Sequence, residues 1–252
     1  MQLHHVEHGS GLPLLVLHGA NVDHRETEAC FEPALHDVPG LRRIYPDLPG
    51  MGRSPAPDTM RSADDVLDAL VGFADEVTNG APRLLVGHSV GAYFARAMAA
   101  RQPERVAGLA LVCPLLPDAR DVPRHRAIAG SGSIGNEDFR SYFVVQTREM
   151  LERYDRYVAP GVDLADVDAI ERISQRWELT DIPGPAYPGP TLLVAGKLDS
   201  TVGYAATADL LRHYPRSTLA VLDEAGHALP HEQPELLRVL LRQWLERVDR
   251  NR

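Results

Sequence analysis

The most constraining feature of this sequence is a regular alternation between two kinds of segment. Short runs rich in Leu and Val are apolar on both faces, which is typical of central strands in a parallel sheet. They occupy residues 12–17, 42–48, 83–89, 106–113, 191–196 and 217–223. Amphipathic segments typical of helices lie between them, at residues 62–79, 91–102, 204–214 and 234–249. Because strands and helices alternate, we expect an α/β fold with a mainly parallel sheet and helices on both faces.

The alternation breaks down at two places. Residues 2–8 and the turn at 9–11 are typical of one arm of an antiparallel hairpin at the edge of the sheet. Residues 114–190 are rich in proline and contain short helical pieces, notably 142–157 and 164–177. No long linker divides the chain into independent units. We therefore expect one core, residues 1–113 and 191–252, with residues 114–190 inserted between two core strands as a helical cap.

Composition narrows the classes of partner. The 252 residues include 26 Lys and Arg against 35 Asp and Glu, which gives a formal net charge of −9, and 44% of them are hydrophobic. This balance is typical of a globular protein with a sizeable core. A net acidic chain without a basic cluster lacks the electrostatic means to hold nucleic acid or an anionic membrane surface. The first residues lack the segments of a secretion signal, so we expect a cytoplasmic protein.

The strongest chemical signal is the motif Gly87-His88-Ser89-Val90-Gly91, which follows a predicted strand and opens a predicted helix. In this context the motif is typical of a nucleophile elbow, a sharp turn that strains the serine backbone and exposes its hydroxyl. The flanking glycines avoid collisions with the neighbouring strand and helix. The helix N-terminus favours negative charge that develops beside the serine. Ser89 is therefore the candidate nucleophile.

A serine hydroxyl needs a histidine base, and the base needs a carboxylate to orient it. Asp199 and His227 each follow a predicted strand shortly after its end. They come after Ser89 in the chain order expected for this kind of elbow. Asp118, which follows the preceding strand, is the reserve acid. The sequence thus predicts a catalytic triad of Ser89, His227 and Asp199.

Together these motifs resemble the α/β-hydrolase superfamily over nearly the whole chain. Besides the serine motif, the matching segments are His18-Gly19-Ala20-Asn21, residues 47–54 with the pattern Asp-x-Pro-Gly-x-Gly-x-Ser, Gly196-Lys197-Leu198-Asp199 and Ala225-Gly226-His227. The resemblance implies that the backbone amides of Ala20 and Val90 form an oxyanion hole. The elbow carries serine where dehalogenases and epoxide hydrolases carry aspartate, which implies attack on a carbonyl carbon.

Further residues are candidates for the substrate pocket, because they follow the oxyanion turn, are aromatic residues of the cap or lie near the later motifs. They are Asn21, His24, Tyr142, Tyr154, Trp177, Tyr204 and His231. For the aromatic residues, helical spacing is equally typical of a packed core. Arginines of the cap such as Arg120 and Arg140 could bind an anionic substrate, although such residues more often form a solvated face.

These features predict a serine hydrolase that acts through an acyl-enzyme on a small or medium carboxylic ester or a related carbonyl substrate. The cap favours a small molecule enclosed from water. The alternatives are a C–C bond hydrolase or thioesterase on the same triad, a cofactor-free oxidase-like or lyase-like enzyme, and a non-catalytic ligand receptor on this fold. Cys30 and Cys113 match no metal-ligand or redox spacing, so neither a disulfide nor a metal is expected. No cofactor is expected either. The expected partner is a small-molecule substrate, and the protein is expected to be a monomer or a homodimer.

Overall fold

The computed structural model describes residues 1–130, 134–180 and 187–251. Its centre is a seven-stranded sheet with the strand order β1-β3-β2-β4-β5-β8-β9. The strands are β1 (His5–Gly9), β2 (Leu12–Leu17), β3 (Leu41–Pro46), β4 (Arg83–His88), β5 (Val106–Val112), β8 (Thr191–Gly196) and β9 (Ser217–Leu222). Neighbouring strands of this sheet pair in parallel, apart from β1, which is antiparallel to β3. The prediction of a mainly parallel sheet is confirmed.

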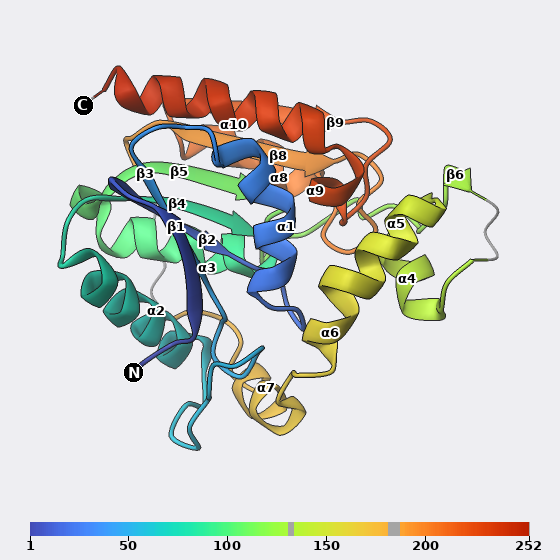
Figure 1. Cartoon of the computed structure of the whole chain (residues 1–252), viewed down its shortest axis with the longest axis horizontal. Coiled ribbons are helices and arrows are strands. Elements are labelled where there is room, and N and C mark those ends of the chain that lie inside the picture. Colours follow the sequence, from blue (N-terminus) through green and yellow to red (C-terminus); the bar gives the residue numbers. More distant parts are fainter. Residues whose placement is uncertain (131–133, 181–186, 252) are drawn as a thin grey trace.

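Helices cover both faces of the sheet, as predicted (Figure 1). One face carries α1 (His24–Leu35) and α10 (Pro234–Asp249), and the other carries α2 (Ala63–Thr78), α3 (Val90–Arg101) and α8 (Ala205–Asp209). The shorter helical elements of the core are η1 (Pro103–Arg105), η3 (Leu210–Arg212) and α9 (Leu229–Glu232). None of the helices in the described part of the chain combines the length and apolarity needed to span a bilayer.

The central strands are apolar on both faces because each face meets a separate core. In β2, Leu14 and Val16 pack in the cluster that includes side chains of α1 and α10. Leu15 and Leu17 point the other way and pack in the cluster that includes α2 and α3. This alternation follows from the two-residue period of a strand.

The predicted N-terminal hairpin is wrong in its pairing. β1 lies at the sheet edge and is antiparallel, as expected, but it pairs with β3 and not with β2. β2 takes β3 and β4 as parallel neighbours, so no side of it remains for β1. At the opposite edge, β9 is only half-buried over most of its length, although its apolar sequence is typical of a central strand.

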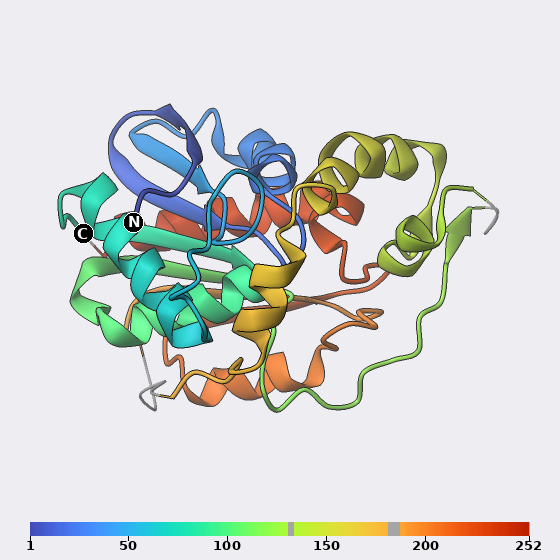
Figure 2. The ribbon, with the colours of Figure 1, turned by 90° about the horizontal axis from the view of Figure 1, so that it is seen from below.

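The inserted segment between β5 and β8 lies beside one end of the sheet for most of its length (Figure 2). It contains β6 (Ala129–Gly130), α4 (Glu137–Tyr142), β7 (Val145–Gln146), α5 (Arg148–Arg153), the π-helical turn η2 (Tyr154–Val158), α6 (Ala159–Val162) and α7 (Val167–Ser174). Phe139, Phe143 and Met150 belong to a small core of this segment, whereas Ile173 of α7 packs in the main core. The cap boundaries of 114 and 190 stay a prediction, and residues 131–133 and 181–186 of the cap lie outside the described residues.

Candidate active site

Ser89 stands at the sharp turn between β4 and α3. Its backbone angles, φ 55° and ψ −118°, lie in a region that residues with a side chain rarely adopt. The glycines on either side make the turn possible. A Cβ on Gly87 would lie 2.4 Å from the carbonyl oxygen of Gly91, and a Cβ on Gly91 would lie 2.2 Å from that of Leu17. The turn therefore holds Ser89 at the carboxyl end of β4, where α3 begins.

The structure brings the three residues of the predicted triad into one hydrogen-bonded chain. Ser89 Oγ lies 2.9 Å from His227 Nε2, and His227 Nδ1 lies 2.8 Å from Asp199 Oδ2. All three side chains are buried, and Asp199 has no exposed surface. Because a carboxylate only accepts hydrogen bonds, Nδ1 of His227 carries the ring proton. Nε2 is left to accept from the Ser89 hydroxyl.

Asp199 is held as a carboxylate by its surroundings. Its Oδ1 accepts from the backbone amides of Thr201 at 2.9 Å and Val202 at 3.0 Å. Burial acts to raise the pKa of Asp199, but the contact with His227 and the two amide hydrogen bonds outweigh it and lower the pKa below its ordinary value. The reserve acid, Asp118, is exposed. The structure thus brings Asp199 to His227 and leaves Asp118 at the surface.

Ala20 and Val90, whose backbone amides are the predicted oxyanion hole, both lie near Ser89. Val90 is the first residue of α3, so its N–H has no acceptor within the helix. Ala20 lies in the turn after β2, and a methyl group on the preceding Gly19 would lie 3.4 Å from Cβ of Ser89. Within the described ranges, neither amide donates to another backbone oxygen. Both amides can therefore donate to an oxygen bound beside Ser89.

Two buried polar side chains fix loops near Ser89, namely the turn that carries Ala20 and the loop of residues 47–54. His18 Nε2 accepts from the amide of Leu48 at 2.8 Å, and His18 Nδ1 donates to the carbonyl oxygen of Gly19 at 2.7 Å. Asp47 accepts from the amide of Arg53 at 2.8 Å, which closes the 47–54 loop on itself. These contacts support structural roles for His18 and Asp47.

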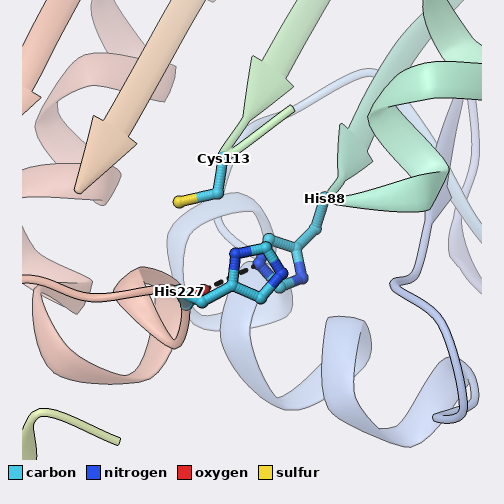
Figure 3. Close-up of side chains that lie close together, drawn as sticks. All are labelled: His88, Cys113 and His227. Carbon is cyan, nitrogen blue, oxygen red and sulfur yellow. Dashed lines mark hydrogen bonds between the residues drawn. The ribbon is translucent and has the colours of Figure 1, made fainter. Parts of the chain in front are cut away.

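His88, the residue before Ser89, packs against the candidate base. Figure 3 shows the rings of His88 and His227 side by side, with Cys113 close to them. The ring centroids are 5.1 Å apart, and His88 Nε2 donates to the backbone oxygen of His227 at 3.0 Å. This hydrogen bond fixes the loop that carries His227.

Two groups of side chains have ligand atoms close enough together to share a metal ion. They are His88, Cys113 and His227, and His4, His24 and Asp47. Both ring nitrogens of His227 already take part in hydrogen bonds, and so do both carboxylate oxygens of Asp47. These hydrogen bonds explain why the side chains of each group lie close together. A metal ion could bind there only by displacing them.

A cavity of about 380 Å³ opens beside Ser89 and His227. Of the predicted pocket residues, Asn21, Tyr142 and Tyr154 form part of its wall. Glu26, His88 and Asp138 also line it, and none of these three was among the predicted pocket residues. The volume is within the range that encloses a small organic molecule.

Two of the predicted pocket residues pack into the protein elsewhere. His24 donates from its backbone and from Nδ1 to Asp47, at 2.8 and 2.7 Å, so its ring is bound to that carboxylate. Trp177 stacks on Tyr93 with ring centroids 5.5 Å apart and belongs to the aromatic part of the main core. Neither residue lines the cavity beside Ser89. Trp177 is partly buried and packs against the main core, and its place in a substrate pocket stays a prediction.

Tyr204 and His231 also lie outside the cavity wall. Tyr204 is half-buried at the start of α8. His231 is 1% exposed, and its Nδ1 accepts from Arg153 Nε at 3.1 Å. Proximity in sequence to Asp199 and His227 therefore did not place either side chain in the wall of this cavity.

Glu26 is one of the cavity residues that the sequence analysis missed. It is 2% exposed on α1, and its Oε1 accepts from the Tyr142 hydroxyl at 2.5 Å. Its Oε2 has no hydrogen-bond partner among the described residues. Helical spacing is the sequence signal that could have identified Glu26. Glu26 and Cys30 have the i, i+4 spacing of one helix face, and both are buried.

Comparison with known proteins identifies the family. Residues 14–238 match the alpha/beta hydrolase family. The chain is 28% identical over 246 residues to a pimeloyl-(acyl-carrier protein) methyl ester esterase of Aeromonas hydrophila, a match that covers 87% of this chain and 90% of that protein. It is 26% identical over 254 residues to a 2-hydroxymuconate semialdehyde hydrolase of a Pseudomonas species, with 96% and 89% covered.

A solved structure gives the same assignment. An alpha/beta superfamily hydrolase from Oenococcus oeni superposes with a TM-score of 0.90 at 28% identity, covering 99% of this chain and 100% of that one. The resemblance drawn from the sequence motifs is thereby confirmed. The chain belongs to the alpha/beta hydrolase family and is a hydrolytic enzyme.

Proposed function

We propose that this protein is a serine hydrolase that cleaves a small or medium carboxylic ester through a covalent acyl-enzyme. The observation that carries the proposal is the hydrogen-bonded chain from Ser89 through His227 to Asp199, with distances of 2.9 and 2.8 Å. This series of hydrogen bonds leads from the cavity, at Ser89, to the fully buried carboxylate of Asp199. Such an arrangement activates a serine hydroxyl for attack on a carbonyl carbon.

In the first half-reaction, His227 Nε2 takes the hydroxyl proton while Ser89 Oγ bonds to the ester carbonyl carbon. The carbonyl oxygen becomes an oxyanion and accepts hydrogen bonds from the amides of Ala20 and Val90. When the tetrahedral intermediate collapses, the C–O bond of the ester breaks and the alcohol leaves with the proton from His227. The acyl group remains on Ser89.

In the second half-reaction, a water molecule gives a proton to His227 and its oxygen attacks the acyl carbon. The intermediate collapses to the free acid, and Ser89 regains its proton from His227. Asp199 stays ionised throughout and stabilises the imidazolium that forms in each half. Its lowered pKa is consistent with this role.

The cap segment, residues 114–190, is proposed to cover this site. Asp138 and Tyr142 of α4 and Tyr154 of η2 supply part of the cavity wall. A cavity of about 380 Å³ that is closed in part by such a cap favours a small or medium ester over a polymer.

The test is hydrolysis of p-nitrophenyl esters from acetate to decanoate by the wild type and by Ser89→Ala. Removal of the nucleophile should lower turnover roughly a millionfold without a change in melting temperature. The wild type should show a cutoff in acyl length where the chain outgrows the cavity. Retention of more than about a tenth of the wild-type rate on every ester would contradict the acyl-enzyme mechanism.

The remaining expectations from the sequence are part of the same proposal. The enzyme would act on a small molecule in the cytoplasm as a monomer or homodimer, with no nucleic-acid or membrane partner. The thiols of Cys30 and Cys113 are both buried and free, which is compatible with a reducing compartment.

A further inference from the structure

A single carboxylate joins the loop that carries His227 to the cap. Glu232, the last residue of α9, is half-buried. Its Oε2 accepts from the amide of Gly226, the residue before His227, at 2.7 Å. Its Oε1 accepts from the amides of Val144 and Val145 of the cap, at 2.7 and 3.1 Å. The carboxylate therefore bridges the loop and a cap segment that is 88 residues away in sequence.

The amides bound to Glu232 depend on its side chain. Within the described ranges, the amides of Gly226 and Val144 donate to no backbone oxygen. Three N–H donors around two oxygens suit an ionised carboxyl group, which only accepts hydrogen bonds. Burial raises the pKa of Glu232, and the three amide hydrogen bonds act against that rise. Hydrogen bonds to a carboxylate are stronger than those between neutral groups, so the bridge is a firm one.

The loop also packs closely against the cap on both sides of His227. A Cβ on Gly226 would lie 2.8 Å from Cγ1 of Val144, so the loop leaves no room for a side chain there. The ring of Tyr142 lies edge-on to that of His227, with centroids 6.1 Å apart. Ala228, the residue after His227, packs in the small core of the inserted segment. The position of His227 is thus tied to the position of the cap.

We propose that Glu232 is a positioning residue for the catalytic base, because it holds Gly226 against the cap and so fixes the place of His227. This proposal rests on the proposed ester hydrolysis at Ser89. Glu232 does not line the cavity, so it acts on the reaction through His227 and not on the substrate. The imidazole must reach Ser89 at 2.9 Å and Asp199 at 2.8 Å at the same time. A displacement of about 1 Å in such a site can cost roughly 100-fold in rate.

The substitution Glu232→Gln tests the side of the bridge that faces the loop. Glutamine keeps one oxygen, which can still accept from the two amides of Val144 and Val145. Its NH₂ group then faces the amide of Gly226, and two donors cannot form a hydrogen bond. We expect kcat on p-nitrophenyl acetate at pH 8 to fall roughly 10- to 100-fold, with KM changed by less than about 3-fold.

The rate at which a fluorophosphonate labels Ser89 separates positioning from a purely structural role. Labelling needs a serine activated by His227, so in folded Glu232→Gln it should slow by about the same factor as kcat. A purely structural role would lower the melting temperature and leave both rates of the folded protein unchanged. Glu235→Gln is the matched control, because Glu235 is exposed on α10 and pairs with Arg238 at 2.8 Å. It should leave both rates as in the wild type.

A second pair of variants disturbs the same contact while Glu232 stays in place. Gly226→Ala puts a methyl group 2.8 and 3.3 Å from the two Cγ atoms of Val144, which should push the loop away from the cap and lower kcat and labelling by roughly 10-fold or more. Val144→Ala removes both of these atoms. The double variant, with Gly226→Ala and Val144→Ala together, should therefore recover to within about 3-fold of Val144→Ala alone.

The outcomes keep this proposal apart from the proposed function. Rates of folded Glu232→Gln within about 3-fold of the wild type overturn the positioning role and leave ester hydrolysis standing. If Glu232→Gln fails to fold, the second pair decides. A fully active Gly226→Ala, or a double variant no faster than Gly226→Ala, then overturns the role of the loop contact. Absence of both ester turnover and Ser89 labelling in the wild type overturns the proposed function and the positioning role with it.

Discussion

The substitution Asp199→Asn changes a few atoms and should disable the candidate site. Asp199 Oδ1 accepts from the amides of Thr201 and Val202, and an asparagine oxygen can keep both hydrogen bonds. The new NH₂ group then takes the place of Oδ2, which accepts from His227 Nδ1 at 2.8 Å. Two donors would face each other, so the imidazole proton moves to Nε2. In that tautomer Nε2 cannot accept the proton of Ser89.

The expected loss follows from this exchange of tautomers. Turnover should fall by about 10⁴-fold, equivalent to about 5 kcal/mol of transition-state stabilisation. The fold should survive, because the two backbone hydrogen bonds remain and the volume of the side chain hardly changes. KM should change much less than kcat, since Asp199 does not line the cavity.

The assay compares kcat and KM on p-nitrophenyl acetate for the wild type, Asp199→Asn and Asp118→Asn, with melting temperatures measured in parallel. Asp118→Asn is the matched control because Asp118 is an exposed carboxylate after the neighbouring strand. It should behave as the wild type. A loss below about 10-fold in folded Asp199→Asn, or a larger loss in Asp118→Asn, would refute the assignment of the acid.

Three further predictions concern the fold and the polar side chains around the site. Gly91→Ala should unfold or inactivate the protein, because the new Cβ would lie 2.2 Å from a main-chain oxygen of β2. Gly72→Ala is the control, since a Cβ at position 72 would have no atom within 4 Å. It should raise the free energy of unfolding, measured in urea titrations, by up to about 1 kcal/mol. Wild-type stability in Gly91→Ala would contradict the elbow geometry. Acidification should lower the free energy of unfolding from pH 6.5 toward 4, because the pKa of His88 is 6.5 in the unfolded chain and about 4 in the fold. Below pH 4.5 the free energy of unfolding should fall further. There Glu26, with its pKa of about 2, stays ionised in the fold, whereas the same residue takes up a proton in the unfolded chain. His88→Gln should flatten the first part of this pH dependence, and an unchanged slope would contradict the buried neutral histidine. Tyr142→Phe should lower the free energy of unfolding by about 1–3 kcal/mol, because Glu26 Oε1 loses its hydroxyl donor, and a neutral effect in thermal melts would contradict that hydrogen bond.

Much of the fold was predictable because it depends on local periodicity. Strands buried on both faces are apolar throughout, and the amphipathic segments between them fix the parallel connections. The pairing of β1 was not predictable in this way, since the choice between β2 and β3 depends on the register of the whole sheet. The edge position of β9 was not predictable for the same reason, because its apolar sequence is equally typical of an edge strand and a central strand.

The triad was predictable from the sequence, whereas the cavity wall was not. Ser89, Asp199 and His227 each follow a strand, and parallel strands deliver such residues to one edge of the sheet. The cavity wall depends instead on how the cap packs against α1, as in the contact between Tyr142 and Glu26, which are 116 residues apart. Patterns within one segment do not encode such a contact.

The most direct test of the central claim is the mass of the protein after reaction with a stoichiometric fluorophosphonate. The account predicts one adduct, mapped by peptide mass spectrometry to Ser89, absent in Ser89→Ala and formed far more slowly in Asp199→Asn. A folded wild-type protein that acquires no adduct, or that acquires it on another residue, would contradict the account.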